Sequence, residues 1–359
     1  MDKMRWKKGI ACGGFFLLLV GLTLWLVLKD QDPAQLQAVL GQVRLPWLLA
    51  GLGAMVVYFL CEAGNLQRGL ALFGSPAPYR ACLGYGVTGF FFSAVTPSAS
   101  GGEPMQLYAM YRDGHAPAPG ALALLTEFLS FQMAAVTLAG LGFFLHRQQI
   151  LALDPGVRLC FLVGAGLNLA VAGVLASAMF SNRVLPALWR GLMVPARRLF
   201  PRKVPRWEQW WQGQWEDLCR CRQSLRENRG QLGKLFLTSL LQLTAYHSVP
   251  FWICLAFGLS GQTLWSVVGL QAVLFLSVSS LPLPGAVGIT EGGFLLLYQT
   301  VFPAAVLPGA MLLSRAVSFY LVLLCCGLGL AAGFLRGSWR ALRPGQPLAA
   351  RSGRVPAEP

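Results

Sequence analysis

Charged residues interrupt the apolar stretches of this chain at a repeated spacing. Glu127 lies in the octet LLTEFLSF, and Arg315 lies at the matching position of a second octet, LLSRAVSF. Glu127 follows Glu103 by the same number of residues as Arg315 follows Glu291. Charges inside apolar spans are costly and usually mark substrate or ion pathways. The repetition therefore indicates a duplicated unit built around a transport path.

Each octet follows an apolar stretch that proline and glycine break in its middle. The first break is TPSASGGEP, at 96–104, and the second is LPLPGAVGITEGG, at 281–293. A backbone that turns inside a membrane leaves polar groups that only protein or water can satisfy. Helices that restart there would aim their N-termini at an interior cavity, which favours phosphate. We expect these residues to bind substrate in that cavity: Ser98, Ser100, Gly101, Gly102, Glu103, Glu127, Pro284, Gly285, Gly288, Thr290, Glu291 and Arg315.

The same charges also admit structural roles. Glu103 and Glu291 each stand near a helix start, where a carboxylate can cap the N–H groups of its own helix. Glu127 and Arg315 can form a buried pair between the two halves, because an unpaired mid-membrane charge costs about 2.5–3.5 kcal/mol. Both alternatives stay open from the sequence. Glu62, near the end of a span, is expected to reach the membrane surface.

Composition predicts a polytopic membrane protein. Of 359 residues, 55% are hydrophobic and 12% are charged, whereas soluble domains carry about 25% charged residues. We expect an all-α fold with about six full transmembrane helices and two re-entrant helical hairpins. The expected helices cover 10–28, 46–64, 118–145, 157–180, 234–258 and 308–334, and the expected hairpins cover 81–110 and 264–302.

The distribution of basic residues predicts the orientation. The net charge is +15, and most of the 29 Lys and Arg residues fall in segments on one side of the expected membrane. This asymmetry places both termini in the cytoplasm. It also makes anionic phospholipid the expected partner of the basic face, with no need to invoke nucleic acid.

The orientation in turn predicts an inverted repeat. If both broken stretches turn back inside the membrane, the first from the cytoplasm and the second from outside, every basic segment stays on one side. Each half then crosses an odd number of times, so the second half is inverted. The expected units are a first repeat at 1–152, a second repeat at 153–340 and a disordered cytoplasmic tail at 341–359.

The second repeat contains a basic loop, at 183–231, that is expected to form an amphipathic helix in the cytoplasm. Trp207, Trp211 and Trp215 recur in it at helical spacing. Such a helix can contact lipid headgroups, or it can simply anchor the chain at headgroup depth.

Several catalytic motifs are absent from the sequence. It has no GxxxxGK[ST] loop for ATP, no HExxH and no GxSxG nucleophile elbow. We therefore expect no cofactor, no metal site and no enzyme activity of the chain by itself. Transport would be passive or driven by a gradient.

Together, the two break sequences resemble the paired signature of the lysylphosphatidylglycerol synthase transmembrane region, a family of flippase-like membrane proteins. The resemblance covers nearly the whole chain. Phe128 departs from it, because an arginine often follows the glutamate at this point in the family. The matching positions are Pro97, Ser100, Gly101, Gly102, Glu103, Glu127, Pro284, Gly285, Gly288, Glu291, Gly292 and Arg315.

The resemblance implies a protein of the bacterial cytoplasmic membrane that moves a lipid such as lysyl-phosphatidylglycerol, which gives resistance to cationic antimicrobial peptides. Larger relatives join this region to a soluble synthase that transfers lysine from lysyl-tRNA to phosphatidylglycerol, and we expect this chain to lack that domain. The alternative function is a membrane subunit that acts with a separate cytoplasmic synthase or glycosyltransferase. Self-association into a homo-oligomer stays open.

Overall fold

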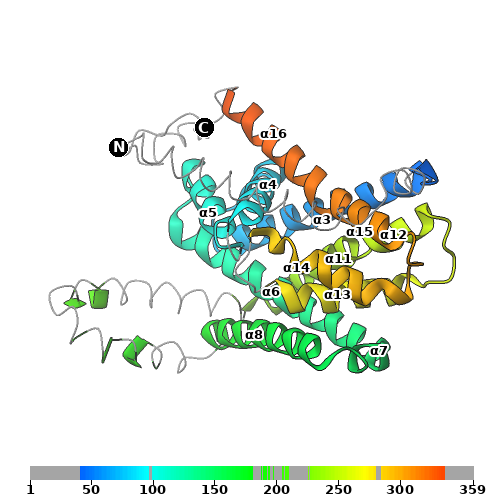
Figure 1. The fold of residues 1–359 in the computed structure, drawn as a ribbon. Helices are drawn as coiled ribbons and strands as arrows, with labels where there is room; N and C mark the ends of the chain where they lie inside the picture. The colour runs from blue at the N-terminus through cyan, green and yellow to red at the C-terminus, as the bar shows by residue number, and fades with distance from the viewer. Residues whose placement is uncertain are drawn as a thin grey trace, which may run out of the picture.

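The fold is helical throughout the residues that the structure describes. The computed structural model describes 41–96, 99–180, 228–279 and 284–335, with isolated residues between 187 and 227. No β-strand occurs among them, which confirms the all-α prediction (Figure 1). The helices are α3 (Leu45–Leu72), α4 (Tyr79–Val95), α5 (Gly102–Arg112), α6 (Pro117–Leu145), α7 (Arg147–Leu151), α8 (Pro155–Phe180), α11 (Arg229–His247), α12 (Val249–Ala256), α13 (Leu264–Val278), α14 (Ile289–Leu297), α15 (Leu307–Arg315) and α16 (Leu321–Leu335).

Four helices of the described chain are long and apolar enough to cross a membrane. They match four of the six predicted spans. The predicted span at 10–28 lies outside the described residues. The one predicted at 234–258 is divided into α11 and α12 at Ser248, with Pro250 in the first turn of α12. The number of six therefore stays a prediction. The four spans are Leu45–Leu72, Pro117–Leu145, Pro155–Ser177 and Leu307–Ala332.

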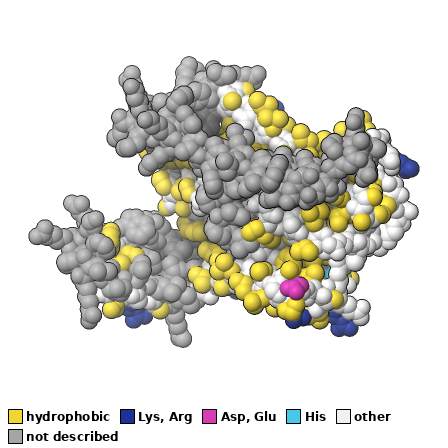
Figure 2. Space-filling model, viewed as in Figure 1, with side chains coloured by type: hydrophobic (Ala, Val, Ile, Leu, Met, Phe, Trp, Pro, Cys, Tyr) yellow, Lys and Arg dark blue, Asp and Glu magenta, His cyan; other side chains and the backbone are white. Residues whose placement is uncertain are grey.

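The outer surface suits a lipid environment. Hydrophobic side chains cover much of the visible described surface, and Lys and Arg lie at its margins (Figure 2). On α8, Leu159, Leu162 and Val163 each expose about 60% of their area. A soluble protein rarely exposes so continuous an apolar surface, so these residues face lipid in a multi-pass membrane protein.

The first broken stretch forms two helices that pack against each other. α4 ends at Val95 and α5 begins at Gly102, and the two helices are in contact, so the chain reverses direction between them. A Cβ on Gly102 would collide with Ser93 and lie 3.0 Å from the carbonyl oxygen of Gly89. Glycine is needed here because the two arms approach so closely.

The second broken stretch has the same plan. α13 ends at Val278, a short 3-10 turn covers Pro284–Ala286, and α14 begins at Ile289 and packs back on α13. Gly285 and Gly288 have φ angles of +58° and +90°, a backbone region that glycine adopts without strain. These residues allow the chain to turn sharply between the two helices.

The open ends of the two hairpins lie at opposite ends of α6. At one end, Ser75 precedes the start of α4 and His115 precedes the start of α6. Ser75 Oγ lies 2.7 Å from His115 Nδ1. At the C-terminus of α6, His146 Nε2 lies 2.8 Å from the carbonyl oxygen of Ser266, near the start of α13. α6 has 29 residues and is about 43 Å long at 1.5 Å per residue. The two hairpins therefore approach the middle of α6 from opposite directions (Figure 1).

The two predicted halves are interlocked rather than separate. α6 of the first half packs on α13 of the second, and α3 packs on α11. Where α6 crosses α13, a Cβ on Gly142 would collide with the backbone of Gly269. Small residues of this kind let membrane helices approach closely.

Candidate functional site

Both breaks border one cavity of about 960 Å³. Ser100 and Glu103 line it from the first hairpin, and Gly285 and Thr290 line it from the second. Near the cavity, Ala94 at the end of α4 and Val287 in the second break share one apolar cluster with Phe319. The tips of the two hairpins therefore meet, although they enter from opposite ends of the molecule.

One side of the cavity holds an ion pair. Arg315 Nε donates to Glu291 Oε1 at 2.7 Å, and Arg315 Nη2 donates to the carbonyl oxygen of Gly285 at 3.2 Å. Both side chains are buried, at 7% and 3% exposure. Glu291 Oε2 also accepts the backbone N–H of Gly288 at 2.7 Å, which caps the start of α14. The pair thus fixes the second break to the helix that carries Arg315.

Aromatic rings enclose the guanidinium group of Arg315. Its Cζ lies 4.3 Å from the centre of the Phe319 ring and 5.7 Å from that of Tyr320, and Tyr320 Oη donates to Glu291 Oε1 at 3.3 Å. Ala316–Tyr320 form a π-helical turn between α15 and α16. The wider turn places both rings next to Arg315, and cation–π contact offsets part of the cost of burying its charge.

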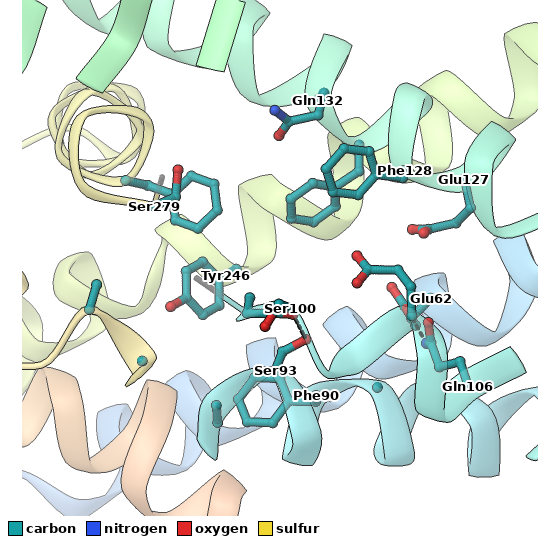
Figure 3. Close-up of a pocket in the computed structure, with 18 of the residues that line it drawn as sticks. Glu62, Phe90, Ser93, Ser100, Gln106, Glu127, Phe128, Gln132, Tyr246 and Ser279 are labelled. Atoms are coloured by element: carbon teal, nitrogen blue, oxygen red, sulfur yellow. Dashed lines mark hydrogen bonds between the residues drawn. The ribbon is translucent and has the colours of Figure 1, made fainter. Parts of the chain in front are cut away.

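The opposite side of the cavity is acidic. The carboxyl groups of Glu62, on α3, and Glu127, on α6, point toward one another (Figure 3). Glu62 Oε1 accepts from Gln106 Nε2 at 3.2 Å, and Glu62 Oε2 accepts from Gln242 Nε2 at 2.6 Å. The two glutamates are 9% and 8% exposed. The expectation that Glu62 reaches the membrane surface is wrong, because α3 continues to Leu72 and keeps Glu62 at cavity depth.

A third polar group lies near the broken end of α13. Gln132 Nε2 and Ser279 Oγ each donate to Asn168 Oδ1 at 3.3 Å. Asn168 Nδ2 donates to the carbonyl oxygen of Leu276 at 2.6 Å. Asn168 thus supplies a partner to a backbone oxygen near the end of α13, where lipid could not.

The predicted site residues divide into three groups. Those that line the cavity are Ser100, Glu103, Glu127, Gly285, Thr290 and Arg315, while Gly101, Gly102, Gly288 and Glu291 are not part of its lining. The side chain of Pro284 is not among those that the structure describes. Ser98 lies outside the described residues.

Two expected roles have a different physical basis in the structure. Gly102 lies against α4, and a Cβ on Gly101 would crowd the side chain of Thr96, so both glycines serve packing within the hairpin. Arg315 pairs with Glu291 of its own half. The open alternative of a Glu127–Arg315 pair is therefore not realised, and Glu127 faces Glu62 instead (Figure 3).

Five polar residues that surround the predicted ones were not predicted as site residues. Their only sequence signal is an amide or carboxylate inside an apolar segment, and the segments involved are far apart along the chain. Among the described residues, no group of three or more His, Cys, Asp or Glu side chains could hold a metal ion. The five residues are Glu62, Gln106, Gln132, Asn168 and Gln242.

The fold and site define a class of protein. The chain forms a multi-pass helical membrane protein in which two broken segments border one cavity with charged residues in its wall. The chain belongs to the family described as the lysylphosphatidylglycerol synthase TM region, which matches residues 14–326 and confirms the resemblance seen in the sequence. A search of curated proteins finds no match. Family membership links the chain to membrane lipids.

Proposed function

We propose that the protein is a lipid translocase of the bacterial cytoplasmic membrane, which moves a phospholipid such as lysyl-phosphatidylglycerol between leaflets. The observation that carries the proposal is the cavity, which both hairpin tips border and which holds an ion pair on one side and carboxyl groups on the other. The headgroup would pass through this cavity while the acyl chains stay in lipid.

The hairpins supply the access paths. Their open ends lie at opposite ends of α6, and α6 is longer than the roughly 30 Å hydrocarbon core. We take the first hairpin to re-enter from the cytoplasm and the second from outside, in an inverted repeat with both termini cytoplasmic. Small movements of either hairpin would then open the cavity to one side at a time.

The cavity walls suit a headgroup that carries both phosphate and amine. Arg315 uses Nε and Nη2 for Glu291 and Gly285, so Nη1 is the donor through which it would bind phosphate. Glu103 and Glu127 would face an amine on the other side. The ion pair positions the guanidinium group, and the aromatic rings beside it exclude other conformations.

A vesicle assay tests this function. Purified protein is placed in phosphatidylglycerol vesicles with a trace of lysyl-phosphatidylglycerol, and a membrane-impermeant amine reagent measures how fast the inner-leaflet lipid becomes accessible. Glu103→Gln should slow the movement at least about tenfold, since a contact to a charged group contributes about 1.5–3 kcal/mol. Ser100→Trp, which fills the cavity at the hairpin tip, should block it.

A substitution outside the cavity provides the control for this assay. Asp154→Asn changes an exposed carboxylate outside the cavity and should move lipid at the normal rate. If the wild-type protein leaves the lipid distribution unchanged but co-purifies with a synthase or glycosyltransferase, the chain is instead the membrane subunit of a lipid-modifying enzyme.

A further inference from the structure

We propose that Glu62 and Glu127 hold one exchangeable proton between them, and that this proton couples lipid movement to a proton gradient. The proposal rests on the translocase function above and adds its energy source. It starts from the arrangement of the two carboxyl groups, which come from different helices and point toward one another inside the protein (Figure 3).

The hydrogen bonds of the two carboxyl groups are unequal. Glu62 accepts from two amide groups, those of Gln106 and Gln242, and such bonds stabilise a carboxylate. No amide or cationic group in the described parts of the chain donates to Glu127, and the carboxyl group that it faces is that of Glu62 (Figure 3). Two facing carboxylates without a cation repel each other strongly at low dielectric. A proton on Glu127, donated to Glu62, satisfies both groups.

An unpartnered atom beside the pair supports this assignment. Gln242 is fully buried, and its Oε1 has no hydrogen-bond partner among the described residues. The same amide group donates to Glu62 at 2.6 Å through Nε2, so Oε1 lies within a few ångströms of the carboxyl pair. A buried acceptor left open there requires a donor. A water molecule between Gln242 and the carboxyl pair would supply this donor and give the proton a path to the cavity.

Among the described residues, no basic side chain is close enough to act on Glu62 or Glu127 and so replace the proton. Arg315 also borders the cavity, but Glu291 neutralises it. α13 has no titratable side chain along its length, and α4 contacts Glu62 through Gly86. The titratable groups that face the pair are Tyr58 and Cys61 on α3, Glu103 on α5 and Tyr246 on α11.

These contacts allow the shared proton to be exchanged for an amine headgroup. When an amine headgroup enters the cavity, its positive charge replaces that of the shared proton, which passes from Glu127 to cavity water beside Glu103. When the headgroup leaves on the other side, the pair takes up a proton from that side. The acidic site therefore always holds one positive charge, and lipid and proton move in opposite directions.

The test compares translocation with and without a proton gradient. Vesicles containing lysyl-phosphatidylglycerol are prepared as above, at equal pH on both sides or with a gradient of about one unit. Wild-type movement should change by up to about tenfold, the ratio of proton concentrations across the membrane. An ionophore that collapses the gradient should remove the change. Glu127→Gln keeps the size of the side chain but cannot release a proton, so its rate should not respond to the gradient, whereas Asp154→Asn should respond as the wild type does.

A second measurement uses the wild-type protein alone, in case Glu127→Gln fails to fold. Addition of lysyl-phosphatidylglycerol to protein in weakly buffered detergent should release protons, seen with a pH dye, and phosphatidylglycerol should not. Absence of release overturns the inference. If the lipid moves at equal rates with and without the proton gradient, the proton coupling is overturned but the translocase function is not. A rate of lipid movement that depends on a sodium gradient instead has the same consequence. Absence of movement under every gradient overturns both.

Discussion

The two halves carry corresponding charges and use them differently. In the second half, Glu291 turns back to cap its own helix and pairs with Arg315 at 2.7 Å. In the first half, the corresponding residues are both acidic, and Glu103 and Glu127 line the cavity. The helices also differ, because a π-helical turn follows Arg315 while α6 is a regular helix around Glu127.

The charged side chains of the second half are fixed in an ion pair, whereas those of the first half stay available at the cavity. An ion pair within one half closes the second hairpin tip against the helix behind it and leaves little net charge there. Two acidic residues cannot do the same, so the first half keeps its carboxyl groups turned to the cavity and to Glu62 from α3 (Figure 3). The two hairpins thus border the cavity with an ion-paired wall on one side and an acidic wall on the other.

The largest effect should come from Arg315. Arg315→Met removes the partner of a carboxylate that is 3% exposed, and breaking a buried pair from one side costs about 3–5 kcal/mol. Thermal unfolding in detergent should show this loss. The double variant Arg315→Met with Glu291→Gln should recover part of the stability, because it removes the uncompensated charge. If the double variant is as unstable as the sum of the two single variants, the two residues do not act as a pair.

The sequence is sufficient to predict the all-α fold and the four membrane spans that the described residues contain. Proline and glycine at 96–104 and 281–293 mark both breaks between helices. The breaks can be inferred from local sequence because proline and glycine interrupt a helix where they occur. The shared spacing of Glu103–Glu127 and Glu291–Arg315 predicts a repeat, which stays a prediction.

The partners of each charge could not be predicted in the same way. Glu62 meets amides from α5 and α11, and these contacts depend on how distant helices cross. Gly101 and Gly102 illustrate a second reason. Glycine permits close approach of either a ligand or another helix, and only the packing of α5 on α4 shows that the second applies.

A smaller effect should follow from Gly285 at the second hairpin tip. Gly285→Ala places a Cβ at a φ of +58° and drives it into the ring of Phe319, which lies against Arg315. Strain and overpacking together should cost about 3 kcal/mol. Gly74→Ala is a matched control, since Gly74 has a φ of +70° with nothing within 4 Å of its Cβ position. It should cost about 1 kcal/mol of strain alone, and equal losses would show that Phe319 can move aside.

A substitution in the acidic wall should lower the stability of the protein less than a substitution in the ion pair. Gln242→Leu removes the shorter of the two amide bonds to Glu62, at 2.6 Å, and a bond to a charged group contributes about 1.5–3 kcal/mol. The longer bond from Gln106, at 3.2 Å, should contribute less, so Gln106→Leu should unfold at a higher temperature than Gln242→Leu. The reverse order would show that Glu62 holds its charge through α5 rather than α11.

The smallest effect should come from an exposed ion pair of nearly the same length. Arg197 Nη2 and Glu208 Oε1 are 2.8 Å apart, but the side chains are 69% and 38% exposed, compared with 7% and 3% for Arg315 and Glu291. Water and salt screen such a pair, so Arg197→Gln should change the unfolding free energy by less than about 1 kcal/mol. Raising the salt concentration should reduce even this difference and leave the Arg315→Met loss almost unchanged, because buried charges are screened much less. A salt-sensitive loss at Arg315 would mean that water reaches the ion pair, and the second wall would then be as open to the cavity as the first.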